Sequence, residues 1–348
     1  MKSLYDLNFE QLQQLAVEYG WKKFRGQQIF QWLYRKRVNS FDEMSDLSLQ
    51  TRETLAKDFI LNPCKLVEKQ VSSDGTCKYL FELEDGALIE SVLMVYDYGK
   101  SICVTSQVGC NMGCSFCASG LLKKRRNLTS GEMVAQVLSV QQDLDATQDR
   151  LSHIVVMGTG EPFDNYENVM NFCATVNHDR GLAIGARHIT ISTCGLVDKI
   201  RKFADEQTQY NLAISLHAPN NQLRDQLMPI NKAYPIEELM DAIAYYCSKN
   251  NRRLTFEYIL LRGVNDQNEH ANQLAKLIKG VNAYVNLIPY NEVDEHGYRS
   301  VDRQSAMKFY DHLMKLGVRC TIRKEHGGDI DAACGQLRAK REKQRLEG

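Results

Sequence analysis

Three stretches near the start of the chain carry apolar residues at helical spacing. Residues 8–19 place one apolar stripe after Asn8, a residue suited to cap a helix, and residues 26–37 and 47–59 have the character of further short helices. The first stripe consists of Phe9, Leu12, Leu15, Ala16 and Tyr19. The pattern predicts a small helical N-terminal module over residues 1–75.

Alternation of apolar and polar residues replaces the helical pattern after this module. Residues 78–95 alternate in this way around Asp85-Gly86, a dipeptide suited to a two-residue hairpin turn. We therefore expect a β-hairpin within residues 76–100 that joins the helical module to the rest of the chain.

From about residue 100 onward, short β-rich runs are separated by helix-compatible stretches. The runs are ICVTSQV, HIVVMG, HITIST, NLAISLH, LTFEYIL, YVNLIPY and VRCTIR. Such alternation favours parallel strands with crossover helices, and the GxGxxG fingerprint of a dinucleotide fold is missing after the first strand. We expect an α/β fold with a partial or complete (βα) barrel over residues 101–335 and a charged C-terminal tail over 336–348.

In such a barrel the functional site lies at the carboxyl ends of the strands. Several expected strands end there in polar or glycine-rich sequence, at residues 158–162, 192–195, 215–217 and 289–291. These four segments are the first candidates for a binding site.

The composition indicates an enzyme-sized globular protein without a general attraction for nucleic acid. The 348 residues are 43% hydrophobic, and 43 Lys and Arg balance 43 Asp and Glu. No apolar run approaches the roughly 18 to 20 residues of a membrane span, and the first residues lack the apolar core of a signal peptide, so we expect a cytoplasmic protein. Any RNA must be bound by local basic patches, namely residues 22–25 with 35–37, residues 123–126 and residues 338–345.

Three of the eleven cysteines form a CxxxCxxC cluster after the ICVTSQV run. Cys110, Cys114 and Cys117 can ligate three irons of an iron–sulfur cubane, and Gly109 and Gly113 allow the loop to fold tightly around it. The fourth iron then stays open, which reductive cleavage of S-adenosylmethionine (SAM) requires. Taken alone, the spacing also allows three buried thiols or a zinc site completed from elsewhere in the chain.

A series of motifs then resembles one family along nearly the whole chain. The motifs are CVTSQVGCNMGCSFCASG, GTGEPFDN, GLAIGARHITIST, SLHAPNNQLRDQLMPIN, VNLIPYN and DIDAACGQL. In this order they resemble the radical SAM superfamily, and within it the dual-specificity adenine-C2 RNA methyltransferases of the RlmN family. The adenine-C8 methyltransferases that confer antibiotic resistance share most of these motifs, so C8 methylation stays an alternative, as does a radical SAM enzyme that does not methylate.

The resemblance implies a partial (βα) radical SAM barrel, a 4Fe-4S cluster on the three cysteines and a SAM site. The residues expected to line the SAM site are Gly160, Glu161, Ser192, Ser215, Leu216, His217 and Asn291. Two positions depart from the family pattern: Thr159 stands where Met is usual, and Cys194 replaces a Ser. We expect neither departure to change the chemistry.

The resemblance also implies a covalent mechanism that uses two SAM molecules per turnover. A methyl group passes from the first SAM to Cys334, and a deoxyadenosyl radical from the second removes hydrogen from that methyl, whose carbon then adds to the adenine. Cys103 matches the cysteine that attacks the resulting thioether and releases the product, leaving a disulfide to be reduced. Glu90 matches the acceptor of the ring proton. From the pattern alone, Cys103 and Cys334 also fit core residues, and Glu90 fits the solvent face of a strand.

The implied substrates are 23S ribosomal RNA near the peptidyl-transferase centre, and tRNA at position 37. An external donor such as flavodoxin or ferredoxin would supply electrons, and we expect a monomer that binds no membrane. Aromatic residues among the first basic patch favour RNA binding by the N-terminal module, although Trp32 and its neighbours also fit a core. A non-catalytic RNA-binding protein with a cluster or zinc is the competing class.

Overall fold

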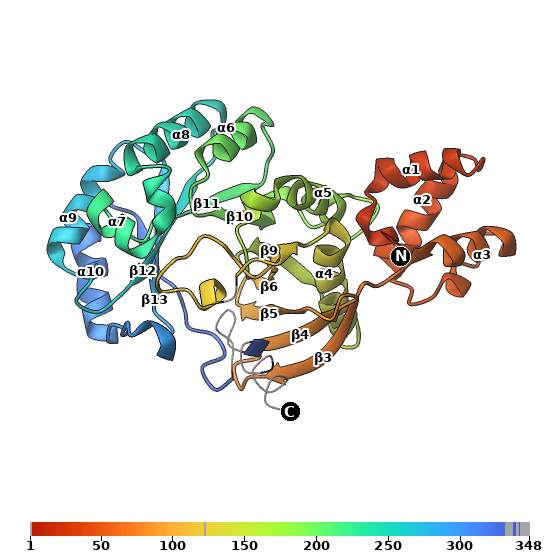
Figure 1. Ribbon diagram of the computed structural model, residues 1–348, viewed down its shortest axis with the longest axis horizontal. Helices are drawn as coiled ribbons and strands as arrows, with labels where there is room; N and C mark the ends of the chain where they lie inside the picture. The colour runs from red at the N-terminus through yellow and green to blue at the C-terminus, as the bar shows by residue number, and fades with distance from the viewer. Residues whose placement is uncertain (1, 122, 331–336, 339–340, 342–348) are drawn as a thin grey trace.

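The computed structural model describes residues 2–121, 123–330, 337–338 and 341. Its N-terminal end consists of three helices, α1 (Phe9–Glu18), α2 (Phe24–Gln31) and α3 (Leu49–Asp58), which project from one side of the molecule (Figure 1). Asn8 caps α1 as expected, since its side chain accepts a hydrogen bond from the backbone N–H of Gln11 at 2.9 Å. The helix predicted over residues 26–37 ends in a π-helical turn, Trp32–Lys36.

In the described chain, ten strands form one open sheet in the order β14-β13-β12-β11-β10-β9-β6-β5-β4-β3. The parallel part consists of β6 (Gly99–Cys103), β9 (Leu151–Val156), β10 (Ile189–Thr193), β11 (Asn211–Ser215), β12 (Leu254–Leu260), β13 (Ala283–Pro289) and β14 (Cys320–Ile322). Six of these strands, β9 to β14, lie on runs predicted from the sequence, whereas β6 includes only the first two residues of the ICVTSQV run. The expected α/β fold with a partial barrel is therefore confirmed, and the barrel does not close because β14 and β3 are the edges of the sheet.

The predicted hairpin is present as β4 (Cys77–Leu83) and β5 (Leu88–Tyr96), which pair antiparallel. The antiparallel part of the sheet has more strands than the predicted hairpin, because β3 (Cys64–Val71) pairs antiparallel with β4 and β6 pairs antiparallel with β5. Since β6 also pairs parallel with β9, the hairpin continues the sheet of the barrel. Side chains of β5 and β6 thereby reach the barrel interior.

Helices cover the outer side of the curved sheet (Figure 1). They are α4 (Ser130–Asp145), α5 (Tyr166–Asn177), α6 (Val197–Asp205), α8 (Ile236–Lys249), α9 (Asn268–Leu277) and α10 (Arg303–Lys315). Their apolar faces and the sheet bury one large common core. This packing leaves the inner face of the sheet and the carboxyl ends of its strands for a site. Among the described residues, no helix has the length and apolar character needed to cross a membrane.

Candidate functional site

The three clustered cysteines lie in a loop that follows the short strand β7 (Gln107–Val108). Gly109 and Gly113 adopt the left-handed φ values of 78° and 68° that the tight loop requires. Cys110, Cys114 and Cys117 are all partly exposed, and all three line a single cavity at the carboxyl ends of the parallel strands. The structure therefore brings together the three residues that the sequence predicted.

Without a bound metal, the surroundings of the cysteine loop favour protonated thiols. Burial raises the pKa of the Cys110 thiol to about 11, and burial with repulsion from the other two cysteines raises the pKa of Cys114. Among the described residues, no group of His, Cys, Asp and Glu is arranged to hold a single metal ion. An iron–sulfur cubane instead distributes its thiolates over separate irons and stabilises each thiolate form, so this loop fits such a cluster.

Five of the predicted SAM residues line the same cavity as the cysteines. They are Gly160, Glu161, Ser192, Ser215 and His217, which lie at the ends of β9, β10 and β11. Gly160 has a left-handed φ of 115°, and a Cβ at this position would lie 2.7 Å from the Cβ of Gln107. Ser192 and Ser215 face each other with their hydroxyl oxygens 3.3 Å apart. The cavity wall is thus built from neighbouring strands, as expected for a barrel.

Glu161 supports this wall from within. Its two carboxylate oxygens accept hydrogen bonds from the backbone N–H of Phe163 at 3.0 Å and of Cys194 at 2.8 Å. Burial raises the pKa of Glu161. The carboxylate therefore links the end of β10 to the turn that carries Gly160. This predicted SAM residue thus has a structural role in the cavity wall.

His217 is a neutral residue of the cavity wall. It has a φ of 57°, which is unusual for a residue other than Gly, and its Nδ1 accepts the backbone N–H of Ile259 at 3.1 Å. Burial lowers the pKa of His217 to about 3. With Nδ1 accepting, the ring proton belongs on Nε2, so His217 can donate one hydrogen bond without introducing charge.

Two predicted SAM residues do not line this cavity with the cysteines. Leu216 is fully buried and belongs to the main core. Asn291 is exposed and lines a neighbouring cavity together with Met94, Cys103 and Arg323. The sequence could not separate these positions, because a strand end sends successive residues to opposite faces.

Glu90 and Cys103 come together in a further small cavity. Lys78 and Thr105 also line it. The Glu90 side chain is only 4% exposed, which excludes the solvent face of the strand, and its Oε2 lies 2.8 Å from the Nζ of Lys78. Cys103 borders both this cavity and the one that contains Asn291.

Cys334, the candidate methyl carrier, lies outside the described residues, and its role stays a prediction. Nearby positions that the structure does describe reach the same region. Leu337 packs on Leu80 and Leu88, and the backbone N–H of Arg338 donates to Oε1 of Glu90. The chain just after Cys334 therefore contacts the candidate base.

Arg224 is a residue of the site to which the sequence assigned no role. Its buried guanidinium donates to the backbone oxygens of Cys194 at 2.6 Å and Leu216 at 3.3 Å, and to Asn231 at 3.0 Å. Arg224 therefore links the backbone at the carboxyl ends of β10 and β11. Arg224 lies within the SLHAPNNQLRDQLMPIN motif, which was the available signal. A motif, however, does not show whether an arginine is buried and bonded to the backbone or exposed to solvent.

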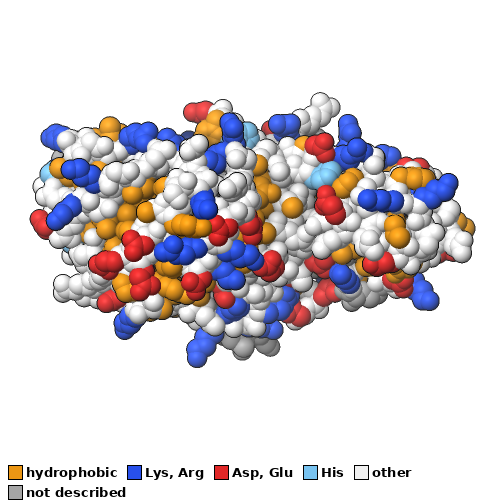
Figure 2. Space-filling view, turned by 90° about the horizontal axis from the view of Figure 1, so that it is seen from above, with side chains coloured by type: hydrophobic (Ala, Val, Ile, Leu, Met, Phe, Trp, Pro, Cys, Tyr) orange, Lys and Arg blue, Asp and Glu red, His pale blue; other side chains and the backbone are white. Residues whose placement is uncertain are grey.

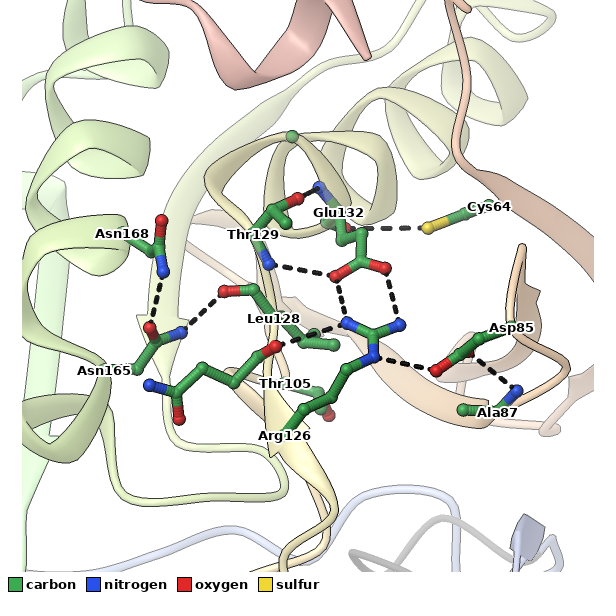
Figure 3. A network of polar contacts seen from close by, with 12 residues as sticks. Cys64, Asp85, Ala87, Thr105, Arg126, Leu128, Thr129, Glu132, Asn165 and Asn168 are labelled. Atoms are coloured by element: carbon green, nitrogen blue, oxygen red, sulfur yellow. Dashed lines mark hydrogen bonds and ion pairs between the residues drawn. The ribbon is translucent and has the colours of Figure 1, made fainter. Parts of the chain in front are cut away.

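In two of the three basic patches, the described residues are less available to bind RNA than the sequence indicated. Figure 3 shows Arg126 clamped between Asp85 and Glu132, with Nη1 and Nη2 each 2.8 Å from a carboxylate oxygen of Glu132. Lys124 pairs with Asp164 at 2.6 Å. In the last patch, Arg338 is 1% exposed. The sequence could not reveal the contacts with Asp85 and Asp164, because these lie 41 residues from Arg126 and 40 residues from Lys124 along the chain.

The N-terminal patch keeps exposed cations but loses most of its expected aromatic surface. Lys22, Lys23, Arg35 and Lys36 are exposed, and Figure 2 shows Lys and Arg side chains at this end of the molecule beside scattered apolar ones. The aromatic side chains behave differently: Trp32 and Tyr34 are core residues, whereas Phe24 is 48% exposed. The expectation of an interleaved aromatic platform is thus wrong for Trp32 and Tyr34.

The two departures from the family motifs have different surroundings. Thr159 lines the small cavity with Glu90, whereas Cys194 borders the cavity of the clustered cysteines. Cys194 is 6% exposed, and burial raises the pKa of its thiol well above the ordinary value, which disfavours the reactive thiolate.

Replacing Cys194 by alanine is expected to preserve function. The backbone of this residue donates to Glu161 and accepts from Arg224, and the substitution retains both bonds; only the contact of the thiol with Glu161 is lost. Iron content and methylation rate should stay within about threefold of the parent protein, a range in which only packing changes. Complete loss of iron would instead assign the Cys194 thiol to the cofactor site.

Comparisons with known proteins agree with this geometry. Residues 104–275 match the family model of the Radical SAM superfamily, and residues 2–61 match the ribosomal RNA large subunit methyltransferase N-terminal domain. Over 347 residues the chain is 59% identical to a probable dual-specificity RNA methyltransferase RlmN of Enterococcus faecalis, a match that covers 98% of this chain and 97% of that one. Its Listeria welshimeri counterpart of the same name is 57% identical, with 97% and 94% covered.

A solved structure extends the likeness to three dimensions. The crystal structure of a radical SAM methyltransferase from Sphaerobacter thermophilus matches with a TM-score of 0.93 and 42% identity, covering 97% of this chain and 99% of that one. The superfamily match implies a 4Fe-4S cluster and SAM, for which the cysteine loop and its cavity fit. This chain belongs to the RlmN family of dual-specificity RNA methyltransferases, within the radical SAM superfamily.

Proposed function

We propose that this protein methylates C2 of adenine in 23S ribosomal RNA and in tRNA through a methylated cysteine. One observation carries the proposal: a candidate base and a candidate resolving thiol, Glu90 and Cys103, line one cavity, and the chain just after Cys334 reaches that base. A carbon of an aromatic ring has no lone pair for ordinary methyl transfer, so chain groups that carry the methyl and remove the proton suit this substrate.

The cofactors would be held at the carboxyl ends of the strands. Cys110, Cys114 and Cys117 would ligate the cluster, and Gly160, Ser192, Ser215 and His217 with Asn291 would contact SAM. When bound, the cluster and SAM supply the methyl group and the radical that removes hydrogen from it. Glu161 and Arg224 would keep the walls of this cavity in place.

The chain's own groups would complete the reaction. Joining the methylene radical on Cys334 to adenine C2 would leave one unpaired electron on the adduct; that electron would return to the bound cofactor, and the Glu90 carboxylate would take the ring proton. The Cys103 thiolate then attacks the sulfur of Cys334: a disulfide forms, the carbon–sulfur bond breaks, and its electron pair goes to the methylene carbon, which takes a proton to become methyl.

Recognition of RNA would fall to the helical module of residues 1–75. Its exposed Lys22, Lys23, Arg35 and Lys36 suit phosphate contacts, and the exposed Phe24 offers one stacking surface. The target adenine must leave its stack to reach a site inside the barrel, which favours unpaired or loop adenines. We also propose a cytoplasmic monomer that receives electrons from a flavodoxin- or ferredoxin-like donor.

The proposal is tested by analysing RNA from cells with and without the gene. We expect 2-methyladenosine to disappear from both ribosomal RNA and tRNA in the deletion strain, measured by liquid chromatography and mass spectrometry after digestion. Loss of 8-methyladenosine would assign the protein to the C8 branch. No change in either nucleoside would contradict RNA methylation and favour another radical SAM reaction.

A further inference from the structure

A buried ion pair joins the two central antiparallel strands next to Cys103. The Nζ of Lys78 lies 2.8 Å from Oε2 of Glu90, and the two side chains are 1% and 4% exposed. Lys78 is opposite Val92, and Glu90 is opposite Leu80, so the pair lies diagonally across β4 and β5. Lysine is rarely buried this completely, and its role here requires an explanation.

Stability alone does not explain the pair. Removing two charges from water offsets most of their attraction, and apolar residues of similar volume are often at least as stable. The location is more informative, because Lys78 and Glu90 line the same small cavity as Cys103. A charged pair is therefore retained beside the thiol that the proposed reaction uses.

Among the described residues, two donors contact different oxygens of the Glu90 carboxylate. Oε2 is held by Lys78 from within the sheet, whereas Oε1 accepts the backbone N–H of Arg338. The second donor belongs to the segment that follows Cys334. Of the two contacts, the one to Lys78 is fixed by strand pairing and does not depend on the position of that segment.

Glu90 can take a proton from substrate only as a carboxylate, so the charged groups around it matter. In the described chain, the titratable and charged groups around Glu90 are Lys78 on β4, Cys103 on β6 and Arg338 near the C-terminus. Arg323 and His326 line the cavity on the other side of Cys103. Of these groups, Lys78 has a side-chain cation in contact with a carboxylate oxygen of Glu90.

We propose that Lys78 is a positioning residue that keeps Glu90 ionised and aimed into the cavity shared with Cys103. The inference rests on the proposed function, in which Glu90 accepts the proton of adenine C2. Lys78 touches neither substrate nor cofactor in this assignment, and acts only through Glu90. Two consequences follow: its loss should be milder at high pH, and it should add nothing to the loss of Glu90.

The experiment uses the cluster-loaded enzyme with SAM, reductant and an RNA substrate. Single-turnover formation of 2-methyladenosine is measured from about pH 6 to pH 9, a range on both sides of neutrality in which the action of a general base can be followed. The variants are Lys78→Met, Lys78→Arg, Glu90→Gln and the double variant Lys78→Met with Glu90→Gln. Lys65→Met, an exposed lysine on the neighbouring strand β3, is the matched control. Intact mass reports methylation of Cys334 separately.

We expect Lys78→Met to be slower by about a hundredfold near pH 7, the scale of lost general-base catalysis, and to recover as the pH rises. Lys78→Arg should keep the pH profile of the parent protein. The double variant should match Glu90→Gln within about twofold, because residues that act as one unit are not additive. Cys334 should still become methylated in every variant, and the control should resemble the parent protein.

The double variant also guards against misfolding, since it removes the unpaired charge that Lys78→Met would bury. A loss in Lys78→Met that is equal at every pH, or that adds to the loss in Glu90→Gln, would overturn the inference and leave the lysine a structural role. Full activity of Glu90→Gln would overturn it by removing the base. If the parent protein forms no methyladenosine, the proposed function itself fails.

Discussion

Replacing Cys114 by alanine is expected to remove most of the cluster iron and to lower methylation by at least about a thousandfold, the scale on which loss of an essential catalytic group acts. Cys114 is the central cysteine of the loop, and it lines the same cavity as Cys110 and Cys117. A cluster held by three thiolates has no spare protein ligand. With only two of these cysteines left, a second iron of the cluster would lack a protein ligand.

Iron content and the visible absorption of the anaerobically reconstituted protein measure this effect directly. Cys247→Ala is the matched control, because Cys247 is also a partly exposed free thiol but lies on α8, far along the chain from the loop. The control should keep its iron and its activity. Unchanged iron in Cys114→Ala would show that the cluster is ligated elsewhere or is absent.

The arrangement of elements was predictable from the sequence because local patterns determine it. The β-rich runs after residue 100 became strands of the parallel sheet, and the alternating stretch around Asp85 became β4 and β5. The apolar stripe after Asn8 became α1. Period-two and helical patterns report which face of an element is buried, and these faces did meet in one core.

Side-chain surroundings were predictable only where a motif fixes them. The cysteine loop and the turn at Gly160 meet in one cavity because parallel strands end at the same edge of the sheet. The solvent face and the barrel interior, in contrast, are indistinguishable for Glu90 in an alternating strand, and only tertiary pairing with Lys78 decides between them. For the same reason, the sequence pattern did not reveal the carboxylate partners of Arg126 or the burial of Trp32.

Replacing Cys103 by alanine is expected to stop the reaction after the RNA has become attached to the protein. Cys103 is 6% exposed and borders both the cavity of Glu90 and that of Asn291, so its thiol can reach a sulfur brought there by the C-terminal segment. Without it, no thiol attacks the thioether. Free methylated RNA should fall by at least about a hundredfold, the low end of the loss of a nucleophile or base.

A denaturing gel with labelled RNA distinguishes this result from simple inactivation. Cys103→Ala should shift the RNA to the mass of a protein–RNA adduct, whereas Cys334→Ala should form neither adduct nor product, because the adduct is joined through Cys334. The double variant should resemble Cys334→Ala. Free methylated RNA from Cys103→Ala at the parent rate would remove the resolving role, and an adduct that forms without Cys334 would mean that another residue carries the methyl group.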